Sequence, residues 1–549
     1  MVKNLVDIDL LKTKLGPVLN INPLTGDPTY FAYHPFLTLY AYAPFFKLFG
    51  ATPLISRVIS LVIFQLGTVV LYKTAADMWN KNIALTAAFF YALFPCSIYF
   101  GKMFLPEVLL STISLVFVWF YSKWVKSERP LFYWGMLATY ALGCNMEWPG
   151  YFLAAAAILH YRYALGMKNK KIYGLLGVGA VSFVIFFLHM RYLTGSFSGA
   201  QTQWPEQFSA SVDGVFSHAI NVRFKPLQLF NSEFYQRLLF DYAFKGFTFP
   251  AVLAASWLIF HRSTMSLKSL IWLVPAFAGA MWTLLFPYVF YGHFYYVAYF
   301  SSLMAIACSL FFHRLPVWGR CVFLAAFLPL AALHVRGLHA ANNSWPQHIM
   351  LGRAISSLAK PGASLATTDA FSSPFIDYYA DGRGMLYDVD SWDKLNYVIK
   401  SGRIRYVSSY VLAYNEFLSA RYPYVTLPFG YKLFDLSGKG WSPAAKIGFI
   451  DSFTWWGSTD GDYLNLSQEE YNSGDYNACV AYSRRALQLN PKMAAAYNNM
   501  GVAFIQLGLY DDAIAACGKA LALDPGSQLA KNNLAWAMSK PHKPLKAGR

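Results

Sequence analysis

Charged residues are scarce in this chain. Only 13% of its 549 residues are charged, while 56% are hydrophobic and 18% aromatic. This balance excludes a soluble protein of this length with one hydrated surface. Acidic residues are the scarcest, with 28 Asp and Glu against 45 Lys and Arg. The basic residues stand in short clusters between apolar runs, a layout that indicates membrane orientation and argues against nucleic-acid binding.

Cysteine is also rare. The chain has six cysteines and no CxxC pair, which argues against a redox motif or a zinc cluster. The first four lie in apolar runs, where cysteine usually packs as a small hydrophobic side chain. The lack of an obvious disulfide pairing favours a bacterial inner membrane over a compartment that forms disulfides.

The chain contains long apolar runs. We expect about ten membrane crossings. They lie at residues 54–73, 82–100, 107–124, 132–147, 150–165, 172–191, 249–260, 270–288, 294–312 and 317–334. The fold class is therefore mainly α, with a polytopic membrane domain that we place at residues 1–337.

The loops between these runs alternate in charge. Basic residues mark one set, and the positive-inside rule assigns that set to the cytoplasm. They are Lys73 and Lys81; Lys123, Lys126 and Arg129; Arg162, Lys168, Lys170 and Lys171; Arg262 and Lys268; Arg314 and Arg320. An even number of crossings would put both ends outside, although residues 1–29 contain no signal-like apolar segment. We therefore expect that the domain lacks its first helix, upstream of Met1.

After the last apolar run the chain becomes hydrophilic. Residues 338–438 combine a helical stretch near Leu351 with short β-rich runs around Leu386, Tyr406 and Val425, which predicts a small extracytoplasmic α/β domain. Residues 439–461, rich in Gly, Ser and Trp, are predicted to be a linker. The C-terminal region would then lie on the periplasmic side of the inner membrane.

Residues 462–549 repeat themselves. Asn490-Pro491 recurs as Asp524-Pro525 with a period of about 34 residues, the spacing of tetratricopeptide repeats. The tail therefore resembles a tetratricopeptide α-solenoid of two repeats and a capping helix from Leu529. Such a tail predicts a protein or peptide partner, but its residues do not identify one.

Polar residues gather at the predicted outer helix ends. Tyr33 and His34 precede Pro35, Glu107 follows Pro106, and Glu147 ends an apolar run. Each has a plain structural interpretation: an aromatic belt at the interface, a helix start, a charge that suits a helix N-terminus, or a solvated helix end. The alternative is that they form one site at a membrane face.

The cationic and aromatic candidates divide in the same way. Lys102 either snorkels to the interface or binds an anion. Arg57 lies one turn inside a helix and needs either an ion-pair partner or an anionic ligand. His293 and Tyr295 stand in a tyrosine-rich stretch that fits an interfacial belt or a binding surface.

The membrane part resembles the C-type glycosyltransferases of the dolichyl-phosphate-mannose protein mannosyltransferase and aminoarabinose transferase kind. Several short matches in the same order carry the resemblance. They are Leu15-Gly16-Pro17-Val18-Leu19-Asn20, Tyr33-His34-Pro35, Leu48-Phe49-Gly50 with Arg57 and Ser60, Pro95 with Ser97-Ile98-Tyr99-Phe100-Gly101, Pro106-Glu107 and Glu147-Trp148-Pro149-Gly150. Two features depart from the family: its acidic motif after the first helix has no counterpart here, and its second proline after His-Pro is Phe36.

The resemblance implies transfer of a sugar from a polyprenyl-phosphate donor at the outer membrane face to a protein, glycan or lipid acceptor. Glu107, Glu147 and His34 are then the catalytic candidates, because an acceptor hydroxyl needs a base. Lys102, Arg57, Tyr33, His293 and Tyr295 are the substrate-binding candidates, since the departing phosphate needs cations. No metal-ligand cluster is visible, and a divalent ion such as Mg or Mn, held partly by the donor phosphate, stays open.

Two other functions remain as alternatives. A transporter or flippase for a lipid-linked glycan would be expected to have ionisable groups or broken helices near the bilayer midplane, and the sequence has no repeated halves. An inactive scaffold that recruits partners through its repeat tail is consistent with the absent acidic motif.

The predicted orientation can be tested by cysteine labelling. In a cysteine-free background, a membrane-impermeant maleimide added from outside should label a cysteine at Ser458 and leave one at Asn169 unlabelled, because the basic loop stays in the cytoplasm. The reverse pattern would overturn the orientation.

Overall fold

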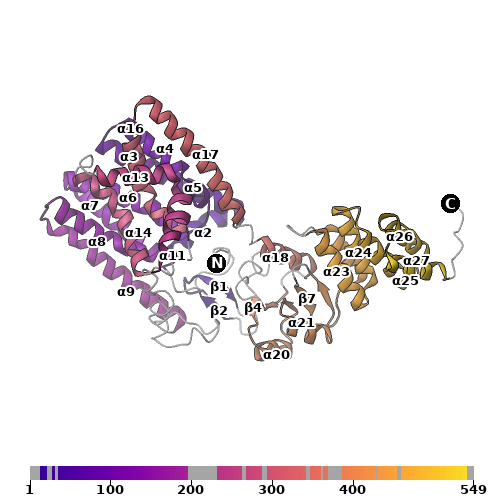
Figure 1. The fold of residues 1–549 in the computed structure, drawn as a ribbon. Helices are drawn as coiled ribbons and strands as arrows, with labels where there is room; N and C mark the ends of the chain where they lie inside the picture. Colours follow the sequence, from indigo (N-terminus) through magenta and orange to yellow (C-terminus); the bar gives the residue numbers. More distant parts are fainter. Residues whose placement is uncertain are drawn as a thin grey trace. The chain divides into compact units, whose positions relative to one another are not determined.

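The computed structural model contains two compact units, Met1–Leu19 with Thr29–Asn343 and Asn20–Pro28 with Ser344–Arg549 (Figure 1). It describes residues 6, 13–21, 27–30, 35–195, 231–261, 267–286, 294–341, 346–359, 363–368, 386–427, 430–453 and 459–540. Near the N-terminus, β1 (Val18–Ile21) and β2 (Pro28–Tyr30) form a two-stranded sheet. Each unit is described by itself below.

The first unit is helical. Proline stands in the first turn of several helices, where its missing N–H and fixed φ suit a helix start. The first half contains α2 (Leu37–Phe49), α3 (Pro53–Met78), α4 (Lys81–Leu93), α5 (Pro95–Phe100), α6 (Pro106–Ser127), α7 (Pro130–Met146), η1 (Trp148–Tyr151), α8 (Phe152–Leu159), η2 (His160–Ala164), η3 (Lys170–Tyr173) and α9 (Gly174–Thr194). The second half contains α11 (Ser232–Gln236), η7 (Arg237–Phe244), α12 (Lys245–Phe247), α13 (Phe249–Phe260), η9 (Leu267–Trp272), α14 (Leu273–Leu285), η10 (Phe294–Phe300), α16 (Ser301–Arg314) and α17 (Val317–Ala341).

All ten predicted apolar segments are mainly helical where the structure describes them; the exceptions are Phe94, Glu147, Leu165 and Phe286. Five described helices are long and apolar enough to cross a bilayer, or six if the bent pair Ser232–Phe247 and Phe249–Phe260 forms one span. Shorter apolar helices, such as Leu270–Leu285, accompany them. The protein is a multi-pass membrane protein, and the number of about ten crossings stays a prediction.

Helix α6 lies at the centre of the first unit. It packs against α3 and α7. In its most apolar stretch of 18 residues, 67% is buried, against 28% in the corresponding stretch of α3 and 17% in that of α17. The exposed apolar side chains of α3, α9 and α17 leave these helices suited to face lipid. Residues at the ends of α6 are therefore held by neighbours on several sides.

The second unit begins with the predicted α/β domain. Its five-stranded mixed sheet has the order β4-β3-β5-β7-β6, in which β3 pairs in parallel with β4 and β5, while β7 pairs antiparallel with β5 and β6. The predicted helix and three strands are confirmed, whereas β3 and β7 were not predicted. The elements are α18 (Pro346–Leu358), β3 (Leu365–Thr367), β4 (Leu386–Asp388), α20 (Trp392–Ser401), β5 (Tyr406–Ser409), α21 (Leu412–Ser419), β6 (Tyr424–Thr426) and β7 (Lys432–Asp435).

The predicted tail of two repeats and a capping helix is confirmed. Its helices are α23 (Asp460–Ser473), α24 (Tyr476–Leu489), α25 (Ala494–Gln506), α26 (Tyr510–Leu523) and α27 (Gln528–Met538). Gly501 lets α25 and α26 approach, since a Cβ there would lie 2.4 Å from Cys517 Sγ. Equivalent asparagines link successive repeats: Asn499 donates to Ser467 Oγ and Asn533 to Asn498 Oδ1, both at 2.9 Å.

The prediction of a linker at 439–461 is wrong in its central part. Residues Pro443–Ser452 form α22, which packs against α24, and Phe449 and Ile450 are buried. One hydrophobic core continues from α18 and the sheet through α22 into the first repeat. The apolar face of α22 makes this segment a packed element that joins the α/β domain to the repeats.

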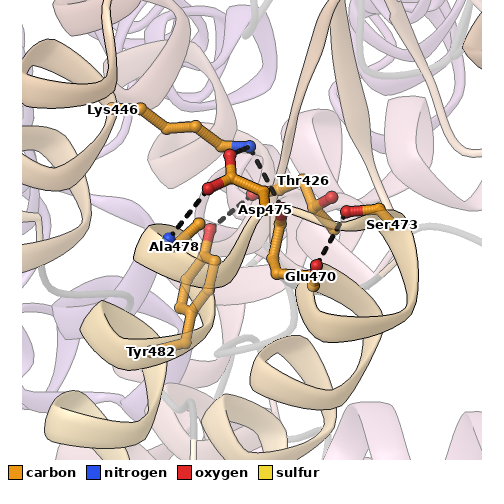
Figure 2. A network of polar contacts seen from close by, with 7 residues as sticks. All are labelled: Thr426, Lys446, Glu470, Ser473, Asp475, Ala478 and Tyr482. Carbon is orange, nitrogen blue, oxygen red and sulfur yellow. Dashed lines mark hydrogen bonds and ion pairs between the residues drawn. The ribbon is translucent and has the colours of Figure 1, made fainter. Parts of the chain in front are cut away.

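A buried ion-pair network fixes this junction (Figure 2). Lys446 Nζ on α22 donates to Glu470 Oε2 at 3.0 Å and to Asp475 Oδ2 at 2.7 Å. Asp475 also caps α24 by accepting from the N–H of Ala478, and Tyr482 donates to the Thr426 carbonyl. Burial lowers the pKa of Lys446, but the two carboxylates outweigh it, so the pKa is raised above its ordinary value. The ammonium is therefore charged throughout the neutral range, and its contribution to stability is lost only when the pH rises through this raised pKa.

Lys446→Met in the full-length protein should destabilise the junction by about 3–5 kcal/mol, because it leaves the Glu470 carboxylate buried without its cation. Lys446→Met with Glu470→Met should recover most of this loss, since both charges are then removed. Hydrogen exchange of α22 to α24 measures the effect. The control is Lys394→Met, which breaks the more exposed Lys394–Asp390 pair and should cost less than about 1 kcal/mol. Equal losses of stability in Lys446→Met and Lys394→Met would show that the buried network contributes no more than an exposed ion pair.

Candidate active site

Four candidate residues lie near helix ends at one end of the first unit. Glu107 stands in the first turn of α6, Glu147 directly follows α7, Arg57 is in the second turn of α3, and Lys102 lies between α5 and α6. Helices α6 and α7 are antiparallel neighbours, so the start of one lies beside the end of the other. The site is therefore assembled from segments that enter or leave the bundle at the same level.

Glu107 and Glu147 form a buried acidic pair. Glu107 is 4% exposed and Glu147 2% exposed, and their carboxyl groups are close enough to interact electrostatically. Glu107 Oε2 has no hydrogen-bond partner among the described residues. The burial of Glu147 excludes its interpretation as a solvated helix end. An isolated buried charge is unfavourable, which makes this pair a candidate for function.

Tyrosines of η10 line the acidic pair. Tyr296 and Tyr299 interact electrostatically with both carboxyl groups, and Tyr295 contacts Tyr296 with ring centroids 4.8 Å apart. Tyr299 is 2% exposed, and its hydroxyl has no partner among the described residues. The predicted residue Tyr295 is thus brought to the site, and Tyr296 and Tyr299 join it. The sequence signal for these two was the tyrosine-rich stretch, which is equally typical of an interfacial belt.

The position of Glu147 depends on a close backbone approach. A Cβ at Gly150 would lie 2.4 Å from the Gly143 carbonyl oxygen, so only glycine lets η1 pass the last turn of α7. Glu147 Oε1 then accepts from the N–H of Trp148 at 3.1 Å. This explains why glutamate, tryptophan, proline and glycine occur together in this motif.

A basic cluster lies at the same end of the bundle as the acidic pair. Lys102 Nζ lies 3.0 Å from His339 Nε2 on α17, and Arg57 interacts electrostatically with both groups. Partial burial, followed by the charge of Arg57, lowers the pKa of Lys102. No Asp or Glu among the described residues pairs with Arg57 or Lys102. A structural ion pair for Arg57 is therefore absent from the described part of the chain, and the cluster can accept an anion.

Helix α5 connects the two clusters. The Tyr99 ring contacts His339 at 5.0 Å between ring centroids, and the Phe100 ring contacts Tyr295 at 6.4 Å. Lys102 follows two residues later. Helix α5 thus contacts both clusters, and Lys102 and Glu107 follow it on one short stretch of chain.

Three candidates lie outside the described residues: Tyr33, His34 and His293. Their roles stay predictions. Phe36, which replaces the expected second proline, packs against Phe186 and His189, with ring centroids 6.4 and 5.2 Å apart. This contact agrees with a change in packing.

The other end of the bundle collects the basic loops. Lys123 at the end of α6 pairs with Asp77 of α3 at 2.6 Å, and Tyr133 at the start of α7 donates to the Lys171 carbonyl. His313 of α16 bonds Thr86 of α4 at 3.0 Å. The candidate site and the basic loops therefore occupy opposite ends of α6 and its neighbours.

Glu107 and Glu147 are the carboxylates that the described part of the site offers to a metal ion. Among the described residues, no group of three or more His, Cys, Asp or Glu side chains could hold a metal ion. Mg²⁺ is commonly bound by one or two carboxylates together with substrate phosphates. Glu107, with its unpartnered Oε2, and Glu147 fit that kind of partial coordination.

Comparison with protein families identifies two regions. Residues 33–192 match the sequence model of the dolichyl-phosphate-mannose-protein mannosyltransferase family, and residues 463–493 and 494–527 each match a tetratricopeptide repeat. Arg57, Lys102, Glu107 and Glu147 all lie in the first match. The resemblance to C-type membrane glycosyltransferases with a tetratricopeptide tail is confirmed. No curated protein sequence matches the chain.

Three solved structures align with this chain at low sequence identity. ArnT from Cupriavidus metallidurans bound to undecaprenyl phosphate aligns with a TM-score of 0.48 and 11% identity over 78% of this chain and 95% of that protein. The apo form of this ArnT gives a TM-score of 0.45, with 11% identity over 78% and 96%. The apo oligosaccharyltransferase from Archaeoglobus fulgidus gives 0.42, with 12% identity over 74% and 68%.

Glu107→Gln should make the detergent-solubilised protein more stable. A carboxyl group beside Glu147 must either keep a second buried negative charge or take up a proton, and both cost free energy that a neutral amide avoids. We expect the melting temperature at pH 7.5 to rise by about 2 °C, the shift that about 1 kcal/mol produces in a large domain. The exposed Glu416→Gln should leave it unchanged. A melting temperature that falls in Glu107→Gln would show that the carboxylate is structural.

Proposed function

We propose that this protein is an integral membrane glycosyltransferase that takes a sugar from a polyprenyl-phosphate donor. One observation carries the proposal: a cationic cluster without acidic partners among the described residues lies at the same end of the bundle as a buried acidic pair. Arg57, Lys102, Glu107 and Glu147 belong to the segment that matches the mannosyltransferase family, whose name specifies a dolichyl-phosphate-linked sugar as donor. The family name and the cations without acidic partners support this donor class.

The acidic pair supplies the base. The acceptor hydroxyl oxygen attacks the anomeric carbon of the donor sugar, and its proton passes to a carboxylate of Glu107 or Glu147. At the same time the bond between the anomeric carbon and the phosphate oxygen breaks, and the phosphate leaves with the electron pair. Two interacting carboxyl groups suit this step because one can hold a proton while the other remains charged.

The cationic cluster stabilises the leaving group. Negative charge develops on the bridging oxygen of the phosphate as the bond breaks, and Lys102 and Arg57 are cations at the same end of the bundle as the acidic pair. The guanidinium of Arg57 can bind two phosphate oxygens, whereas the Lys102 ammonium acts as a point charge. A divalent ion held by Glu107, Glu147 and the donor phosphate would neutralise part of the same charge.

Orientation and partners complete the proposal. The basic loops at the opposite end of the bundle support a site at the outer face, with the C-terminal unit on the periplasmic side of an inner membrane. Tyr33, His34, His293 and Tyr295 would line the sugar and acceptor side of the site. The acceptor would be a protein, as the family description indicates, or another glycan or lipid. The tetratricopeptide repeats would engage a protein or peptide partner.

The test measures transfer of labelled mannose from a polyprenyl-phosphate carrier in membranes that contain the full-length protein. Glu107→Gln and Lys102→Met should each lower turnover by at least about tenfold, because one transition-state interaction of this kind is worth at least about 1.4 kcal/mol. Both variants should accumulate in the membrane like the parent protein.

Glu128→Gln and Lys81→Met at the opposite end of the bundle are the matched controls, with the same chemical changes and no expected loss of turnover. Near-normal turnover in Glu107→Gln and Lys102→Met would remove these residues from the site. A parent protein that moves the intact carrier lipid across the membrane would identify a flippase. One that does neither would identify a scaffold that acts through its repeats.

A further inference from the structure

His339 was not among the candidates from the sequence, which placed the end of the membrane domain at residue 337. The structure extends α17 to Ala341, so His339 lies in the last turn of this helix. Its Nε2 is 3.0 Å from Lys102 Nζ, across 237 residues of sequence. Its ring also contacts the Tyr99 ring at 5.0 Å between centroids, which holds the imidazole against the segment that carries Lys102.

The chemistry of this contact is asymmetric. A lysine ammonium has three donors and no acceptor, so the imidazole must accept through a lone pair on Nε2. The remaining two N–H groups of Lys102 are then free for another acceptor. The contact therefore fixes a long flexible side chain while leaving most of its hydrogen-bonding capacity available.

The surroundings of His339 carry positive charge. Lys102 and Arg57 are the charged groups that act on it, and Arg336 lies on its own helix. His334, on the same helix, instead interacts electrostatically with Lys245. Among the described residues no carboxylate faces His339. A group in this position is useful to an anion site only if it organises the neighbouring cations or adds a charge of its own.

We propose that neutral His339 is a positioning residue that aims the Lys102 ammonium at the phosphate of a polyprenyl-phosphate ligand. The proposal rests on the function proposed above and assigns His339 no contact with the reacting atoms. Protonation of His339 removes the accepting lone pair and places a third positive charge against Lys102. Ligand binding should therefore weaken, relative to a variant that cannot titrate, as the pH falls.

The test measures binding of undecaprenyl phosphate to the full-length protein in nanodiscs. His339→Gln keeps an oxygen that accepts from Lys102 and should bind within about twofold of the parent at pH 7.5, whereas His339→Leu should bind about fivefold to tenfold more weakly. His313→Gln is the matched control, since His313 bonds Thr86 at the opposite end of the bundle. It should bind like the parent.

The pH dependence separates positioning from direct binding. The ratio of the dissociation constants of parent and His339→Gln cancels the titration of the ligand itself. The dissociation constant of the parent divided by that of His339→Gln should rise as the pH is lowered from 7.5 to 5.5. A ratio that falls would make the imidazolium a direct phosphate ligand and overturn the proposal, as would unchanged binding in His339→Leu.

Sugar-transfer measurements on the same variants distinguish the two proposals. If the parent transfers sugar and His339→Leu raises neither the dissociation constant nor the donor KM, the positioning role alone is wrong. If binding depends on His339 but no sugar is transferred, the positioning role stands and the transferase function is wrong. A parent protein that does not bind the carrier lipid contradicts both.

Discussion

The juxtaposition of two buried carboxyl groups is the constraint on which the candidate site depends. Glu107 and Glu147 come from adjacent antiparallel helices, and in an apolar bundle their charges have little solvent to relieve them. They lie together because α6 starts where α7 ends, and because Gly150 lets the chain pass close to Gly143. A protein selected for stability alone would have little reason to keep such a pair.

The separation of charge along the bundle follows from the same physics. Lipid tolerates ionisable side chains mainly at helix ends, so acidic and basic groups are restricted to the two ends of the spans. At one end Lys123 pairs with the Asp77 carboxylate, and Lys126 donates to the Asp77 carbonyl. At the other end, Arg57, Lys102 and His339 have no acidic partner among the described residues. The three basic groups at this second end are therefore available to bind an anion.

The second unit shows how a repeat tail is attached. Two tetratricopeptide repeats bury little surface on their own, and short solenoids need capping elements. Here α22 and the sheet supply that surface, through one continuous hydrophobic core and the Lys446 network. The first repeat is thus committed to the α/β domain, and the second repeat and α27 remain as the more independent part of the tail.

The sequence by itself determined the class of the protein. Apolar runs, loop charge and a 34-residue period are local signals, and they predicted the helical segments, the mixed α/β region and the repeats. Only the tertiary structure decided which distant residues meet. Helices that are apolar on nearly every face give no periodic signal of which side faces a neighbour. The pairing of Glu107 with Glu147, and of Lys102 with His339, therefore depends on helix packing. The same holds for α22, whose apolar residues are buried because they pack against α24.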